Sequence, residues 1–247
     1  MPRITKIDWA LRPKALLAIA NCQFSGGQFT CLLGPSGVGK SSLLRLIANL
    51  YSKGDQPVAP TKIRTSDNQD INSQIAYMSQ SDSLLPWLNT LDNTLLGARL
   101  RGEVTIAKKN QAIALLKRVG LKNPQQKVEQ LSGGMRQRVA LVRTLLEDKP
   151  IVLMDEPFSA LDVITRLDLQ DLAAELLKNK TVILVTHDPL EALRLGHVIY
   201  VLSGTPVQLG QPITPEGPTP RATTSPELLK LQGELLARLQ HAQEVTS

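Results

Sequence analysis

Apolar positions along this chain follow two patterns. Mostly apolar, β-prone runs, typical of buried parallel strands, occupy residues 29–33, 151–154 and 181–186. Between the first two runs, residues 81–139 change to apolar side chains at helical spacing, most clearly over 92–100 and 105–119. The alternation predicts an α/β fold, a mixed or parallel sheet with a helical subdomain inserted at about 81–139.

The two ends of the chain carry weaker signals. Residues 4–17 alternate loosely and predict one or two antiparallel edge strands, and Ser25-Gly26-Gly27-Gln28 predicts a hairpin-type turn. Residues 211–225 are rich in proline and threonine, which predicts an exposed linker. A proline and leucines at helical spacing follow Ser225 and predict a terminal helix. We therefore expect a main domain over 1–210, and a linker with a helix over 211–247.

A glycine-rich segment follows the first buried strand and precedes a helical pattern. It reads G-x-x-x-x-G-K-S, the P-loop, in which backbone N–H groups and a helix N-terminus hold phosphate. Lysine supplies a charge for the β- and γ-phosphates, and the serine hydroxyl is a ligand for Mg²⁺. The predicted nucleotide-binding residues are Gly34, Pro35, Ser36, Gly37, Val38, Gly39, Lys40, Ser41 and Ser42.

Charged residues stand at the ends of the next two buried strands. Asp155 ends one of them and is predicted to orient Mg²⁺, since parallel strand ends meet at one edge of a sheet. Glu156 points the other way by strand alternation, which suits a general base. His187 follows the third strand at the same edge and is predicted to contact the γ-phosphate.

Two further segments allow more than one interpretation. Ser132-Gly133-Gly134 predicts a helix N-terminus, either a plain cap and turn or an anion site. The run Leu84-Leu85-Pro86-Trp87-Leu88 fits either core packing in the helical subdomain or an exposed docking patch.

Composition narrows the classes of function. The net charge of the 247 residues is +6, which favours anionic partners, but no basic cluster interleaved with aromatic residues indicates nucleic acid. Cys22 and Cys31 form no C-x-x-C pair and are predicted to be buried thiols. The sequence shows no signal peptide and no apolar run long enough for a membrane span.

Together these segments resemble the ATP-binding subunit of ATP-binding cassette (ABC) transporters over about residues 4–211. The resemblance implies that Gln80 ligates Mg²⁺ and the attacking water, and that Glu156 is the base. It implies that Ser132 and Gly134 contact ATP held by a second copy, with Asp162 across the interface and His187 as the switch histidine. Trp9 is the nearest candidate for stacking on adenine.

The segments 85–88, 134–138, 153–158 and 186–188, with Glu191-Ala192, resemble importer ATPases for nitrate, sulfonates, taurine and thiamine-pyrimidine precursors. This subgroup implies ATP and Mg²⁺ as cofactors, a head-to-tail dimer, and a permease with an indirect solute-binding partner. It also implies a peripheral place on the cytoplasmic face of the plasma membrane. Alternatives are a soluble cassette ATPase acting on nucleic acid or ribosomes, and an exporter; one cassette without a long coiled coil or fused membrane helices argues against both.

Overall fold

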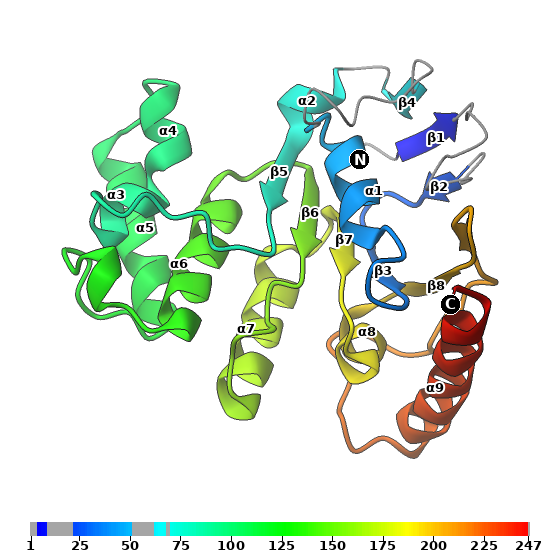
Figure 1. Cartoon of the computed structure of the whole chain (residues 1–247). Helices are drawn as coiled ribbons and strands as arrows, with labels where there is room; N and C mark the ends of the chain where they lie inside the picture. The colour runs from blue at the N-terminus through cyan, green and yellow to red at the C-terminus, as the bar shows by residue number, and fades with distance from the viewer. Residues whose placement is uncertain (1–3, 9–21, 51–61, 68–69, 247) are drawn as a thin grey trace. The chain divides into compact units, whose positions relative to one another are not determined.

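The computed structural model describes residues 4–8, 22–50, 62–67 and 70–246 (Figure 1). The chain forms two compact units, which are described separately. Unit 1 comprises Met1–Ile75, Pro150–Asp155 and Leu177–Ser247, and unit 2 comprises Ala76–Lys149 and Glu156–Leu176. The proposed adenine-stacking residue, Trp9, lies outside the described residues.

The main sheet of unit 1 carries the predicted buried strands. Within this unit the strand order is β6-β7-β3-β8-β9, parallel except for the antiparallel pair β8-β9. Every residue of β3, β6 and β7 is buried, as their continuous apolar sequences predict. The strands are β3 (Phe29–Leu33), β6 (Ile151–Asp155), β7 (Thr181–Val185), β8 (Val198–Ser203) and β9 (Gln208–Leu209).

Three longer helices of unit 1 pack on or beside this sheet: α1 (Lys40–Ile47), α8 (Pro189–Leu195) and α9 (Pro226–Thr246). Helix α1 contacts β6 and β7, and α8 contacts β3. The terminal helix α9, red in Figure 1, packs against α8 and β8. It buries Leu228, Leu235 and Ala242, one residue every two turns. The terminal helix therefore packs on its own unit.

A second sheet in unit 1 contains the N-terminal strands. Its order is β2-β1-β4 with antiparallel pairing, as predicted, and its strands are β1 (Ile4–Asp8), β2 (Cys22–Phe24) and β4 (Lys62–Thr65). The turn predicted at Ser25–Gln28 is present at Gly26 and Gly27 and leads into β3, but it closes no hairpin, because β2 pairs with β1 while β3 lies between β7 and β8. An apolar strand buried on both faces is stabilised more between two parallel neighbours than at the edge of a small sheet. The short helix α2 (Ile71–Gln74) was not predicted.

The segment before α9 is only partly an exposed linker. Ile213 forms a β-bridge with Ile199, and both Ile213 and Pro215 are buried. Arg221 is also buried, and its guanidinium donates to the carbonyl oxygens of Leu193 at 2.9 Å, Gly196 at 2.8 Å, Pro215 at 2.7 Å and Glu216 at 2.7 Å. The prediction of exposure fails here because one arginine supplies donors to carbonyl groups that would otherwise need water.

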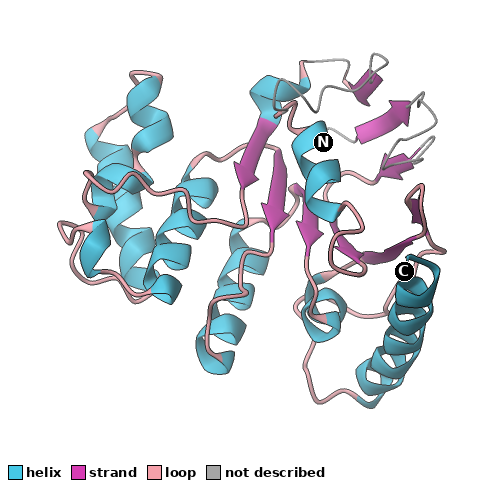
Figure 2. Ribbon diagram, viewed as in Figure 1, coloured by secondary structure: helices cyan, strands magenta, loops and turns pink. Residues whose placement is uncertain are grey.

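Unit 2 is mostly helical (Figure 2). Helices α3 and α5 pack against α6, and the helix predicted over 92–100 is divided at Leu95 into α3 and α4. The elements that follow β5 (Ile75–Met78) are α3 (Thr90–Thr94), α4 (Leu96–Leu100), α5 (Ile106–Arg118), the 3-10 helix Val128–Gln130, α6 (Gly133–Leu146) and α7 (Val163–Leu176). The sequence predicts a helical subdomain at about 81–139.

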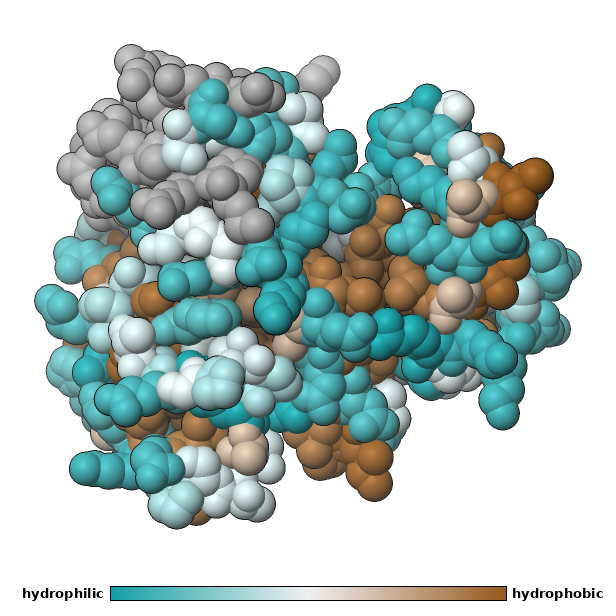
Figure 3. All heavy atoms as spheres, turned by 180° about the vertical axis from the view of Figure 1, so that it is seen from behind, coloured by the Kyte–Doolittle hydropathy of each residue, from teal (hydrophilic) through white to brown (hydrophobic). Residues whose placement is uncertain are grey.

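The face seen in Figure 3 is largely polar, with apolar side chains exposed among the polar ones. Large apolar side chains exposed among the described residues include Trp87, Leu100, Ile106, Val163 and Ile164. No helix within the described parts of the chain has the length and apolar character needed to cross a bilayer.

Candidate nucleotide site

The P-loop connects β3 to α1, and its glycines are needed for its backbone path. A Cβ added at Gly34 would lie 2.7 Å from the carbonyl oxygen of Leu202, so no larger residue fits there without a shift. Gly39 is the N-cap of α1 and has a φ of 108°, a conformation that other residues rarely adopt. The loop therefore leads into the N-terminus of α1, where an anion can accept hydrogen bonds from backbone N–H groups.

Lys40 lies folded along the P-loop. Its Nζ donates to the carbonyl oxygens of Gly34 at 2.8 Å and Pro35 at 2.9 Å, and its side chain is buried. An ammonium group held by backbone oxygens at the N-terminus of a helix is a fixed positive charge beside the positive end of the helix dipole. This arrangement suits a polyphosphate.

Ser41 and Asp155 meet beside the loop. The hydroxyl of Ser41 donates to Oδ1 of Asp155 at 3.0 Å, and Asp155 is 0% exposed. Strands β3 and β6 both pair with β7, and Leu32 and Asp155 share the register position of Val185. The structure thus brings the carboxyl ends of these strands together, as the buried apolar runs predict.

His187 lies at the same edge of unit 1, two residues after β7. The backbone N–H of Thr186 continues the pairing with β3 by donating to Leu32 at 3.2 Å. The hydroxyl of Thr186 accepts from the N–H of Asp188 at 3.0 Å, which forms the turn that carries His187. The imidazole of His187 is exposed on this turn.

Glu156 and Gln80 are in contact within unit 2. The amide Nε2 of Gln80 donates to Oε2 of Glu156 at 3.1 Å. Glu156 has a φ of 50°, so the chain turns sharply here and does not extend the strand that ends at Asp155. The two consecutive carboxylates therefore have different partners: Asp155 contacts Ser41 of the P-loop, and Glu156 contacts Gln80.

Gln137 on α6 holds the turn that carries Glu156, and the sequence did not single it out. Its Nε2 donates to the carbonyl oxygen of Glu156 at 3.0 Å and to the hydroxyl of Ser159 at 3.3 Å. Its Oε1 accepts from the N–H of Ala160 at 2.9 Å. Gln137 is only 6% exposed, and a polar residue on the buried face of α6 was the available signal.

The glycine pair at 133–134 forms the first turn of α6. Ser132 is the N-cap, as predicted, and its hydroxyl accepts from the N–H of Met135 at 3.3 Å. A Cβ on Gly134 would lie 3.1 Å from the carbonyl oxygen of Ala160, so glycine permits this close approach. Ser132 and Gly133 are exposed, which leaves the helix N-terminus open to an anion.

Asp162 stands at the start of α7. Its Oδ1 accepts from the N–H of Thr165 at 3.0 Å, and the hydrogen bonds from Thr165 lower the pKa of its carboxyl group. Asp162 is exposed, so its carboxylate can also face a neighbouring molecule.

The segment 84–88 is buried at Leu84 and exposed at Trp87. Leu84 is buried, which fits core packing, whereas Trp87 is 76% exposed. An indole with this exposure is not stabilised by the core of its own chain and is available to a partner.

The chain matches known proteins along most of its length. The family described as "ABC transporter" matches residues 17–159. An uncharacterized ABC transporter ATP-binding protein of Haemophilus influenzae is 42% identical over 97% of this chain and 98% of that protein. An aliphatic sulfonates import ATP-binding protein of Rhodococcus jostii is 44% identical, over 72% of this chain and 69% of its own length.

A taurine import ATP-binding protein of Pseudomonas aeruginosa is 39% identical, over 79% of this chain and 74% of that protein. Among solved structures, the dimeric post-hydrolysis state of the ATP-binding cassette MJ0796, bound to ADP and Pi, superposes with a TM-score of 0.70. It is 29% identical, with 88% of this chain and 100% of the other covered. The chain therefore belongs to the ABC transporter family, as an ATP-hydrolysing subunit of an importer.

Proposed function

We propose that this ATPase energises the uptake of a small sulfonate, such as taurine or an aliphatic sulfonate, through a membrane permease. The two import relatives, one for aliphatic sulfonates and one for taurine, support this class of solute. Nitrate and thiamine-pyrimidine precursors, the other solutes of the resembling subgroup, are alternatives that a transport assay separates. The subunit would lie on the cytoplasmic face of the plasma membrane, and a solute-binding protein would act indirectly through the permease.

The contact between Ser41 and Asp155 beside Lys40 is the observation that carries the nucleotide role. In this proposal the backbone of residues 34–42 and the Nζ of Lys40 bind the phosphates of ATP. The hydroxyl and carboxylate oxygens of Ser41 and Asp155 fit Mg²⁺, which prefers oxygen ligands. When bound, the cation neutralises charge on the phosphates. Gln80 is proposed as a further ligand through its amide oxygen.

Hydrolysis is assigned to Glu156, Gln80 and His187. The carboxylate of Glu156 accepts the proton of the attacking water, and the contact with the Gln80 amide fixes its orientation. The exposed imidazole of His187, at the edge where the P-loop begins, contacts the γ-phosphate. Each of these roles places a polar group where charge develops on the transferring phosphoryl group.

A second copy of the chain completes the site in this proposal. Ser132, Gly133 and Gly134 present an open helix N-terminus to the ATP held by the partner copy, and Asp162 faces the interface. The dimeric state of the related cassette bound to ADP and Pi supports this arrangement. Two copies then enclose two nucleotides, and closure excludes water from both.

The permease is proposed to contact the segment that ends in Trp87. Leu84 anchors this segment in the subunit, while the exposed indole of Trp87 supplies a large apolar contact. Trp87 follows Gln80 by seven positions in the chain. Co-purification of the chain with a multi-span membrane protein tests the partner class. Stable binding to ribosomes or DNA without such a protein would favour the soluble alternative.

Replacement of the proposed base tests the catalytic assignment. We expect Glu156→Gln to bind ATP with unchanged affinity and to lower kcat by about 10²- to 10⁴-fold, the range for a general base. Nucleotide affinity is measured with a fluorescent ATP analogue, and turnover by phosphate release. Glu175→Gln, an exposed carboxylate of the same unit, is the matched control. Wild-type turnover of Glu156→Gln would remove this residue from the base role.

A further inference from the structure

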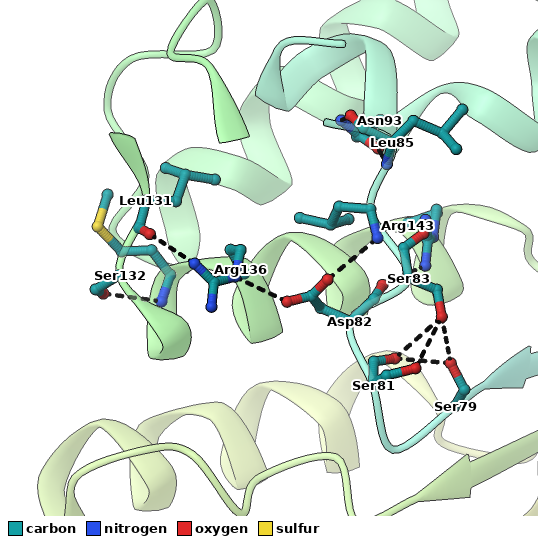
Figure 4. A network of polar contacts seen from close by, with 12 residues as sticks. Ser79, Ser81, Asp82, Ser83, Leu85, Asn93, Leu131, Ser132, Arg136 and Arg143 are labelled. Atoms are coloured by element: carbon teal, nitrogen blue, oxygen red, sulfur yellow. Dashed lines mark hydrogen bonds and ion pairs between the residues drawn. The ribbon is translucent and has the colours of Figure 1, made fainter. Parts of the chain in front are cut away.

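Gln80 of unit 2 belongs to a compact polar turn over residues 79–83, of which Figure 4 labels Ser79, Ser81, Asp82 and Ser83. The hydroxyl of Ser79 donates to the carbonyl oxygen of Ser81 at 2.7 Å, and the hydroxyl of Ser83 lies 3.0 Å from those of both Ser79 and Ser81. Ser83 has a φ of 46°, an uncommon conformation for a residue other than glycine. A turn of this kind persists only when surrounding contacts hold it.

Two arginines of α6 provide those contacts. Arg143 donates to the carbonyl oxygens of Asp82 at 2.8 Å and Ser83 at 3.0 Å. Arg136 donates through Nε to Oδ2 of Asp82 at 2.9 Å, while Oδ1 of Asp82 accepts from the N–H of Leu84 at 3.2 Å. Both the backbone and the side chain of Asp82 are therefore fixed to α6, as Figure 4 shows.

The guanidinium of Arg136 also contacts the residue just before α6. Its NH1 atom donates to the carbonyl oxygen of Leu131 at 3.1 Å, directly before Ser132. Arg136 thus joins two segments: the residue that precedes the open helix N-terminus, and the residue two positions after Gln80. Neither segment can shift relative to the other without loss of a charge-assisted hydrogen bond.

The pair contributes little to the stability of the fold. The side chains of Arg136 and Asp82 are 39% and 30% exposed, and ion pairs with this access to water add little to the free energy of unfolding. The pair does have a fixed geometry, because each partner makes a second hydrogen bond to the backbone. Placement of the turn is therefore its main effect.

We propose that Asp82 and Arg136 are positioning residues for ATP hydrolysis. The pair holds the turn at 79–83 against the start of α6, and this keeps the amide of Gln80 on the carboxylate of Glu156. The inference rests on the roles proposed above for Gln80 and Glu156. It adds that these residues depend on a side-chain link to the helix that begins at Ser132.

Single and double variants of the complete chain test the link. We expect Asp82→Asn and Arg136→Met each to lower kcat about tenfold, because a small displacement of a catalytic group is enough for such a loss. The dissociation constant for a fluorescent ATP analogue should change less than about twofold, since neither residue belongs to the P-loop. The double variant should be no slower than the slower single variant, because both remove one interaction.

An exposed ion pair elsewhere in unit 2 supplies matched controls. Arg118 donates to Glu175 at 2.7 Å, and we expect Arg118→Met and Glu175→Gln to keep wild-type kcat. The melting temperature of each variant is measured in parallel, and we expect shifts of only a few degrees for either pair. A drop in kcat confined to the Asp82–Arg136 pair, at similar melting temperatures, separates positioning from general stability.

The inference is overturned if both single variants keep wild-type kcat, or if their effects multiply in the double variant. If Asp82→Asn does not fold, Arg136→Met carries the same test, because it leaves the backbone contacts of Arg143 in place. Glu156→Gln is included as a reference. If Glu156→Gln loses turnover while Asp82→Asn and Arg136→Met keep it, only the positioning role is contradicted. If Glu156→Gln itself keeps full turnover, the proposed function is contradicted.

Discussion

The turn that carries Glu156 should be sensitive to a single buried amide. Gln137→Met replaces that amide with an apolar group of similar length, so the packing of α6 is kept while three hydrogen bonds are lost. The carbonyl oxygen of Glu156 keeps two donors, both from Ser159: the hydroxyl at 3.1 Å and the backbone N–H at 3.4 Å. The N–H of Ala160 loses the acceptor that Gln137 provides.

The expected losses of stability and kcat in Gln137→Met follow from the hydrogen bonds that this variant keeps. Ala160 is exposed, so water can replace part of the lost hydrogen bond, and we expect the free energy of unfolding to fall by about 1–2 kcal/mol. Glu156 has a φ of 50°, a conformation that costs about 1–3 kcal/mol unless its surroundings hold it. Release of this turn moves the carboxylate, and a loss of about 1.4 kcal/mol in transition-state stabilisation would lower kcat about tenfold.

Steady-state phosphate release by the purified chain measures kcat, and a fluorescent ATP analogue measures nucleotide affinity. Gln125→Met is the control, because the Gln125 amide is exposed and makes its side-chain contact with Asn89. We expect the control to match the wild type in both assays. A kcat for Gln137→Met within twofold of the wild type would show that this amide does not position Glu156, and the reasoning above would be wrong.

Three further predictions concern unit 1. Lys40→Ala should abolish ATP binding or turnover, and unchanged ATPase activity would refute the P-loop assignment. Arg221→Met removes the donor to four carbonyl groups, and we expect the free energy of unfolding to fall by about 3–5 kcal/mol. Thermal unfolding should show this as a drop of about 10 °C in melting temperature. A drop under 2 °C (about 1 kcal/mol) would contradict this role. His197 accepts a hydrogen bond on Nδ1 from the N–H of Phe29 at 3.1 Å, and burial, with the charge of Arg221, lowers its pKa below the usual 6.5. The unfolded chain then binds more protons below pH 6.5, so this stabilisation is complete above that pH and is lost as the pH falls. In His197→Asn, which keeps an acceptor, the melting temperature should fall less between pH 7.5 and 5.5, and an equal or steeper fall would contradict the assignment.

The sequence determined the segments whose signal is local. The buried strands β3, β6 and β7 could be predicted because each is a continuous apolar run between polar turns. The P-loop glycines and the cap at Ser132 were equally readable, since both depend on local backbone structure: Gly39 adopts a φ of 108°, and the Ser132 hydroxyl accepts from an N–H three residues on. The meeting of Ser41 with Asp155 followed from the general rule that parallel strand ends share one edge.

Only the tertiary structure decided contacts between segments distant in the chain. It assigned β2 and β3 to different sheets, although one short turn joins them. It also turned the side chains of Gln137, Arg136 and Arg143 toward the loops that carry Glu156 and Gln80. Such contacts depend on how a helix is rotated against its neighbours. That rotation is set by the packing of many apolar side chains together, so the pattern along one segment does not contain it.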